Sequence, residues 1–300
     1  MGTLAEMLST PLGVIEWFVY LLAAVMFVIG LHLMNSPKTA RKGNMVSAIG
    51  MVFAVAMAFI VLFAGEASNG FKHGVAVIVL IVGIVIGAVA GVVSAKKVKM
   101  TDMPQLVSVF NTVGGGAAAL VALNDILTSA ETPSIVVLIT AGLGIMIGSV
   151  TFSGSLIAAG KLQGIKWVKK LSLPGKGFWN ILFVVLTIVS FVMLCVQPNQ
   201  RLLWSILTTV FALCYGLVFV IPIGGADMPV VISVLNACTG TAVAMSGLAI
   251  NNIALIVAGA LVGAAGVTLS IAMSKAMNRP LLSVLAGGFG GSNSAAGAGE

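Results

Sequence analysis

Charged residues are scarce in this chain. Asp, Glu, Lys and Arg make up 8% of its 300 residues, whereas hydrophobic residues make up 59%. A soluble domain of this length could not bury that much apolar surface. The apolar runs also lack the alternating pattern of an outer-membrane β-strand. These absences exclude a soluble enzyme and a β-barrel, and they favour an all-α membrane protein.

Cysteines and known ligand-binding motifs are few. The three cysteines, Cys195, Cys214 and Cys238, lie in apolar runs, and their odd number does not favour a disulfide framework. The sequence contains no phosphate-binding loop, metal cluster or nucleophile triad. Gly142 and Gly144 lie inside an apolar run with no preceding strand, so we interpret them as helix-packing residues. The sequence therefore predicts no catalytic residue, no bound metal and no nucleic-acid partner for this chain.

Nine apolar runs are long enough to cross about 30 Å of hydrocarbon as helices. They cover residues 13–34, 44–65, 74–95, 103–123, 134–159, 177–196, 202–222, 228–249 and 253–274. Thirteen of the fifteen Lys and Arg residues lie in alternate connections, and only Lys72 and Arg201 lie on the other side. The positive-inside rule then predicts an external N-terminus and a cytoplasmic C-terminus in a multi-pass bundle.

Glycines at helical spacing predict close packing, and a repeated motif predicts internal symmetry. Gly83, Gly87 and Gly91 are four residues apart, so they share one helix face that another helix can approach.

An offset of 125 residues matches Asp102, Ser108, Asn111 and Gly115 with Asp227, Ser233, Asn236 and Gly240. Matching runs are four apart in order, an even number. Both copies should therefore cross the membrane in the same direction, as parallel repeats.

Asp102 and Asp227 lie just before the first turn of two predicted helices, each with a proline two residues later. Helix capping alone would account for them, because a short carboxylate accepts the free N–H groups of the first turn. A functional role is the alternative. It is favoured because these two acids fall at the cytoplasmic end, while the other acids before Glu300 are external. Both interpretations stay open.

Asn111 lies nine residues after Asp102, which is about 13 Å along a helix, and Asn236 lies at the same depth in the second copy. An unpaired amide is unfavourable in hydrocarbon, so both should face the bundle interior. Gly115 and Gly240, four residues on, leave room there for a water or a close helix. The amides form either a hydrogen-bonded clamp or part of a polar path that includes Ser155. They can orient water but cannot carry a proton.

The last residues are rich in Gly, Ser and Ala, which is typical of a flexible linker. We expect residues 1–286 to form the nine-helix transmembrane domain and residues 287–300 to form a linker. Such a linker predicts a cytoplasmic domain that is missing from this chain or supplied separately.

Several long motifs resemble one known family. They include Lys99-Met-Thr-Asp-Met-Pro-Gln105, Gly160-Lys-Leu-Gln-Gly164, Gly224-Gly-Ala-Asp-Met-Pro-Val230 and Lys275-Ala-Met-Asn-Arg279. They are similar to the membrane domain of the beta subunit of proton-translocating NAD(P) transhydrogenase. The resemblance implies a bacterial inner-membrane protein that couples hydride transfer between NADH and NADP⁺ to proton movement. It also implies a linker that leads to an NADP(H)-binding domain, an alpha subunit with membrane helices and an NAD(H) domain, and a second copy of the assembly. By itself the chain should bind neither nucleotide.

The resemblance also implies roles for single residues. Asn236, Ser155 and Asp227 match positions linked to the proton path or its coupling, and Asp102 and Arg279 match others at the cytoplasmic end. Gly259, Gly263 and Gly266 match a glycine-rich packing face of the last helix. Well-known members have a histidine where this chain has Asn111, so we expect the titrating histidine on an alpha-subunit membrane helix. A secondary transporter with parallel repeats is the alternative function, and a structural anchor for soluble domains is a third.

Overall fold

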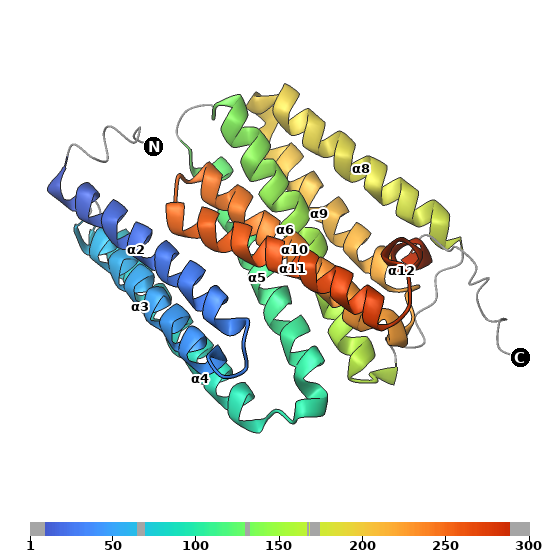
Figure 1. Cartoon of the computed structure of the whole chain (residues 1–300). Coiled ribbons are helices and arrows are strands. Elements are labelled where there is room, and N and C mark those ends of the chain that lie inside the picture. The colour runs from blue at the N-terminus through green and yellow to red at the C-terminus, as the bar shows by residue number, and fades with distance from the viewer. Residues whose placement is uncertain (1–9, 65–69, 130–132, 167, 169–174, 289–300) are drawn as a thin grey trace, which may run out of the picture. The chain divides into compact units, whose positions relative to one another are not determined.

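The computed structural model describes residues 10–64, 70–129, 133–166, 168 and 175–288, and their regular structure is entirely helical. Figure 1 shows the long helices, which are α2 (Pro11–Met34), α3 (Ala40–Ala64), α4 (Gly70–Lys97), α5 (Met103–Thr128), α6 (Ile135–Leu162), α8 (Lys176–Val196), α9 (Arg201–Val220), α10 (Met228–Ala249) and α11 (Ile253–Ala276). The short elements are the 3-10 helices η1 (Met100–Asp102), η2 (Pro198–Gln200) and η3 (Gly225–Asp227), and the helix α12 (Leu281–Gly288).

Nine helices in the described part of the chain are long and apolar enough to cross a membrane. They correspond one to one with the nine predicted runs, which confirms the predicted fold class. Local signals fix several of the helix starts. The side chains of Ser134 and Asn252 accept the backbone N–H of Val137 and Leu255, at 3.4 and 3.1 Å, and so cap α6 and α11.

Residues Met1–Met100 form one compact unit, which we call unit 1. Within it α2 packs against α3, and a Cβ added to Gly43 of α3 would lie 2.9 Å from Leu33 Cβ of α2. The glycine face predicted on α4 behaves differently. No described atom of this unit lies within 4 Å of a Cβ added to Gly83, Gly87 or Gly91. This face is therefore not used for helix packing within unit 1.

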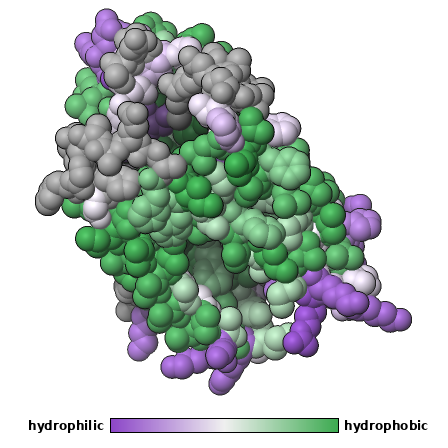
Figure 2. Space-filling view, turned by 90° about the vertical axis from the view of Figure 1, so that its left-hand side faces the viewer, coloured by the Kyte–Doolittle hydropathy of each residue, from purple (hydrophilic) through white to green (hydrophobic). Residues whose placement is uncertain are grey.

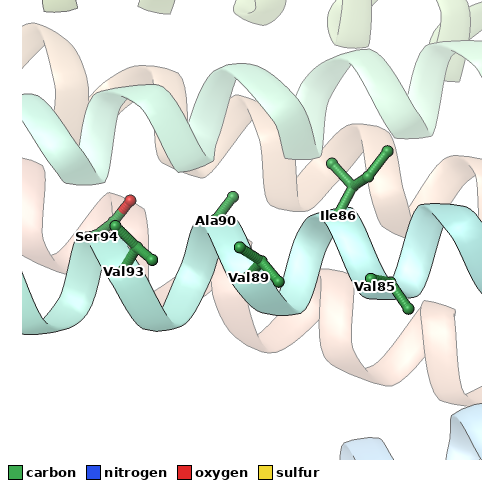
Figure 3. A pocket seen from close by; sticks show the side chains of 6 residues that line it. All are labelled: Val85, Ile86, Val89, Ala90, Val93 and Ser94. Carbon is green, nitrogen blue, oxygen red and sulfur yellow. The ribbon is translucent and has the colours of Figure 1, made fainter.

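A shallow pocket runs along α4, and Figure 3 shows the side chains that line it: Val85, Ile86, Val89, Ala90, Val93 and Ser94. Only Ser94 among them has a polar side chain. In the space-filling view, hydrophobic side chains cover a broad band and hydrophilic side chains gather toward its margins (Figure 2). Such a surface is suited to hydrocarbon, and the pocket offers no set of polar groups that would orient a ligand.

Residues Thr101–Glu300 form the second unit, unit 2. Its helices pack as the neighbouring pairs α5–α6, α8–α9 and α10–α11, and both α9 and α10 also pack on α6. Two apolar clusters hold its ends together. One surrounds Met228 and Val231 at the start of α10, and the other surrounds Ala249 and Ile126 at the opposite end.

The repeated helices of unit 2 run in the same direction. Near the start of α5, Gln105 donates to the carbonyl of Leu162 at the end of α6, at 3.3 Å. Beside it, Lys161 of α6 donates to the carbonyl of Ile223, shortly before α10 begins, at 2.7 Å. The starts of α5 and α10 thus lie at one end of unit 2, which we call the Asp227 end. The predicted parallel repeats are confirmed.

The short helix α12 lies outside the nine predicted runs. Its Val284 is 1% exposed and packs in the cluster around Met228. Eight residues are too few to cross a membrane, so the apolar-run criterion could not find this helix. Residues 289–300, most of the predicted linker, lie outside the described residues.

Replacing Gly240 by alanine should weaken the contact between α10 and α11. The added Cβ would lie 2.6 Å from Gly263 Cα and 2.7 Å from the Gly259 carbonyl oxygen, which are backbone atoms and cannot rotate away. Overpacking of this kind costs about 1–3 kcal/mol. We expect a lower midpoint of thermal unfolding for Gly240→Ala, measured on purified protein in detergent.

Gly83→Ala on α4 is the matched control, because an added Cβ there meets no described atom within 4 Å. Alanine is favoured over glycine in a helix by about 1 kcal/mol, so the midpoint should stay or rise slightly. A Gly240→Ala midpoint equal to that of the unmodified protein would contradict the packing role of Gly240.

Candidate functional site

The centre of the candidate site is a hydrogen bond between α5 and α6. Asn111 Nδ2 donates to Ser155 Oγ at 2.8 Å, and the two residues are 6% and 0% exposed. Ser108 Oγ donates to the carbonyl oxygen of Ser155 at 2.8 Å, which ties the same two helices one turn away. The amide therefore faces the interior of unit 2, as expected. The other amide atom, Asn111 Oδ1, is buried and has no hydrogen-bond partner among the described residues.

The second copy is built differently at the same depth. Asn236 is half-buried, and no hydrogen bond of its side chain is found among the described residues. After the first helix of each copy the repeat offset shortens to 117 residues, so that Thr151 and Ser153 match Thr268 and Ser270. The counterpart of Ser155 is then Ala272, which has no hydroxyl. The structure thus brings Asn111 and Ser155 together but leaves Asn236 out of that contact.

Serines on α10 and α11 join these two helices instead. Ser270 Oγ donates to Ser233 Oγ at 3.0 Å, and Ser233 Oγ donates to the carbonyl of Gly266 at 3.2 Å. Both serines are buried. The second copy therefore keeps a polar contact between its helices, but it is made one turn closer to the Asp227 end than Asn236.

Asp227 forms an ion pair rather than a helix cap. Arg279 Nε lies 3.4 Å from Asp227 Oδ1, although the direction of the N–H does not make it a hydrogen bond. The Asp227 side chain is 12% exposed and that of Arg279 is 39% exposed. Asp227 makes no side-chain cap hydrogen bond to α10. Capping is thus not what holds this acid in place.

Asp102 occupies the equivalent position before α5 and also makes no side-chain cap hydrogen bond. Its Oδ1 accepts a long hydrogen bond, 3.4 Å, from the hydroxyl of Thr101. Among the described residues, the ion pair between Asp227 and Arg279 has no counterpart at Asp102. The two acids therefore share a position in the repeat but differ in their partners.

The glycines assigned to helix packing lie where backbones approach closely. A Cβ added to Gly115 would overlap Thr151 Oγ1, and one added to Gly240 would overlap the backbone of Gly263. A Cβ on Gly266 would lie 2.7 Å from Ala237 Cα, and one on Gly259 would lie 2.7 Å from the Gly240 carbonyl. Gly263 itself has ordinary spacing, with its nearest such atom at 3.5 Å. Gly115 thus makes room for a close helix.

Motif matching does not identify two further buried polar residues, Thr239 near the middle of α10 and Asp125 near the far end of α5. Thr239 of α10 is 6% exposed, its Oγ1 has no partner among the described residues, and its Cγ2 would lie 3.4 Å from a Cβ on Gly114 of α5. Asp125 of α5 is 8% exposed, and its Oδ2 likewise has no such partner. The spacing gives a signal for Asp125. It lies 14 residues, close to four helical turns, after Asn111 and so on the same buried face.

The groups around Asn111 can accept and donate hydrogen bonds but do not titrate. An amide and hydroxyls can orient water, and the buried unpaired atoms Asn111 Oδ1 and Thr239 Oγ1 are polar enough to bind it. The described residues do not fit a nucleotide or a metal ion. Cβ atoms on Gly142 and Gly144 would lie 2.7 Å from Phe191 and Ser246 side-chain atoms, so these glycines serve packing. No group of three metal-ligating side chains is found in the described part of the chain.

Comparison with known proteins gives one consistent result. The family model of the NAD(P) transhydrogenase beta subunit matches residues 16–300. Two curated relatives, both named NAD(P) transhydrogenase subunit beta and both from Rhodospirillum rubrum, are each 39% identical to this chain over 287 residues. The match covers 93% of this chain but only 59% of each relative. The chain therefore spans well under two thirds of the length of these relatives.

The hydrogen bond between Asn111 and Ser155 can be measured by a double-mutant cycle. We expect the free energies of unfolding of Asn111→Ala, Ser155→Ala and the double variant to give a coupling of about 0.6–1.7 kcal/mol, the usual range between membrane helices. The control cycle pairs Asn236→Ala with Ser155→Ala and should give a coupling near zero. Equal coupling in both cycles would contradict the asymmetry between the two copies.

Proposed function

Because this chain belongs to the NAD(P) transhydrogenase beta subunit family, we propose that it is the membrane part that moves protons while hydride passes between NADH and NADP⁺. The observation that carries this proposal is the arrangement of unit 2. It has a partly buried ion pair at one end and a buried amide–hydroxyl contact between α5 and α6, inside the helices. Charged and polar groups inside a transmembrane bundle cost free energy. Where they occur they usually serve a function, and proton paths are a common one.

The orientation follows from the basic residues. By the order of the predicted runs, thirteen of the fifteen Lys and Arg residues fall on the same side of the membrane as Asp227. The positive-inside rule makes this side cytoplasmic and the N-terminus external. The location is a bacterial inner membrane, in which the protein is a multi-pass component. The Asp227–Arg279 pair then faces the compartment in which the nucleotides are found.

Hydride transfer takes place outside this chain. The glycines that superficially resemble a nucleotide loop, Gly142 and Gly144, lie in helix contacts instead. The NADP(H)-binding domain follows the last helix, and the NAD(H) domain belongs to an alpha subunit whose membrane helices lie beside this chain. The complete enzyme is a dimer containing a second copy of this chain. The role of this chain's own residues is to position water and to respond at Asp227 to the state of the nucleotide domain.

The titrating group on the path comes from a partner. Asn111 lies on the proposed proton path, where a titratable side chain could relay protons, but an amide neither takes up nor releases a proton near neutral pH. Asn111 and Ser155 can hold a water by hydrogen bonds, and a histidine on an alpha-subunit helix would supply the exchangeable proton. The family match does not favour the secondary transporter with parallel repeats.

Proton movement coupled to hydride transfer is the property to measure. In liposomes that contain the full-length protein with its partner subunits, we expect Asp227→Asn to lower the number of protons moved per hydride. The rate of proton movement should fall at least about tenfold relative to the rate of hydride transfer, because a loss of about 1.4 kcal/mol of interaction energy lowers a rate tenfold. Asp102→Asn should have a smaller effect, because Asp102 has no ion-pair partner among the described residues.

The alternatives give different results in the same liposomes. A structural anchor predicts an unchanged proton-to-hydride ratio in Asp227→Asn. A secondary transporter predicts solute-driven proton movement without any nucleotide. Either result would replace the proposed function.

A further inference from the structure

Lys161 makes a contact that the proposed function does not yet use. It lies in the last turn of α6, and its side chain crosses to the end of α9. There its Nζ donates to the carbonyl oxygens of Val220 at 3.2 Å, of Ile221, and of Ile223 at 2.7 Å. A lysine ammonium has three N–H donors, and three main-chain acceptors face it here.

One acceptor, the Val220 carbonyl, belongs to the last residue of α9 and also accepts the backbone N–H of Ile223 at 3.2 Å, and the other two belong to the residues that follow the helix. α9 ends at Val220, so its last carbonyls have no partner within the helix. They also carry the negative end of the helix dipole, which favours a cation. Val220, Ile221 and Ile223 are at most 6% exposed, so water cannot easily replace the ammonium. Lys161 therefore holds the end of α9 from a different helix.

The segment held by Lys161 leads directly to Asp227. After Ile223 come Gly224 and Gly225, both exposed, and an added Cβ at either would meet no described atom within 4 Å. Glycine gives the backbone wide conformational freedom, and the Asp227 N–H donates to the Gly224 carbonyl at 3.1 Å, which links η3 to the residues before it. The position of Asp227 opposite Arg279 thus depends on what fixes the chain just before these glycines.

The same helix connects this segment with the buried amide contact. Ser155, which accepts the hydrogen bond of Asn111, lies six residues before Lys161 on α6. α6 therefore carries the amide contact and, less than two turns further toward its C-terminal end, the Lys161 contact.

We propose that Lys161 is a positioning residue that fixes the connection between α9 and α10 and so keeps Asp227 in reach of Arg279. This proposal rests on the proposed function for its consequence, which is that coupled proton movement requires Lys161. The geometric part concerns only the order of η3 and can be tested by itself.

The first measurement follows the mobility of η3. A spin label is attached at Ala226→Cys, an exposed position in η3, in full-length protein with its partner subunits and with Cys195, Cys214 and Cys238 replaced. We expect a more mobile label in Lys161→Met, which keeps the long side chain but removes the donors. Lys161→Arg keeps a cation with donors and should restore the immobile spectrum. Lys166→Met, at an exposed lysine five residues after Lys161 and beyond the end of α6, is the matched control and should leave the spectrum unchanged.

The second measurement is the proton-to-hydride ratio in liposomes. Lys161→Met removes the hydrogen bonds that a charged group donates, so we expect it to lower coupled proton movement on the order of tenfold. Hydride transfer between the nucleotides should persist, because the proposed function places that reaction outside this chain. Lys161→Arg should recover most of the ratio, and Lys166→Met should keep it. If Lys161→Met does not fold, Lys161→Gln, which removes the charge and one of the three N–H donors, takes its place with the same expected direction of change.

The outcomes separate the two proposals. An unchanged label spectrum in folded Lys161→Met overturns the positioning role. A mobile label with an unchanged proton-to-hydride ratio overturns its importance for coupling. If the unmodified complex moves no protons at all, the proposed function fails, whereas the label spectra still decide whether Lys161 positions η3.

Discussion

The arrangement of unit 2 depends on the close approach of helix backbones at glycine. Hydrocarbon is as apolar as the side chains it surrounds, so helices in a membrane associate by close packing rather than by the hydrophobic effect. At α10 and α11 a Cβ on Gly259 would lie 2.7 Å from the Gly240 carbonyl, and at α5 and α6 a Cβ on Gly148 would lie 2.7 Å from the Gly115 carbonyl. Contacts this tight fix how far each helix extends along its neighbour. This axial position of one helix against the next decides which polar side chains of the two helices lie close enough to hydrogen-bond.

Most polar side chains in these helices are satisfied without joining two helices. Thr112 donates to the carbonyl of Ser108 at 2.9 Å, and Thr241 donates to that of Ala237 at 3.0 Å, one turn back along the same helix. Such bonds remove the penalty for a hydroxyl in hydrocarbon but specify no partner helix. An amide is different, because it presents two donors and an acceptor beyond the reach of its own backbone. Asn111 therefore selects its neighbour, whereas the threonines do not.

The sequence predicts the helices well because each is defined by its own residues, and it predicts long-range contacts poorly. Apolar length identifies all nine transmembrane helices, and the repeat identifies their parallel order. The partner of Asp227 is Arg279, 52 residues away, and no periodicity relates the two. The carbonyls bound by Lys161 are about 60 residues away and belong to the backbone, which carries no sequence signal. Asp125 is the exception, because its spacing from Asn111 already places both on one helix face.

The difference between the two copies of the repeat gives the site its direction. Asn111 is held by Ser155, so changing its partner requires breaking a buried hydrogen bond. Asn236 stands at the same depth, but Ala272 replaces the serine, and its amide has no described protein partner to lose. Of these two amides, only that of Asn236 has no hydrogen bond to the described protein that a change of partner would break. The second copy also contains the acid with an ion-pair partner, Asp227. The amide without a described partner and the paired acid thus lie on one helix, α10, while the hydrogen-bonded amide lies on α5, against which α10 packs.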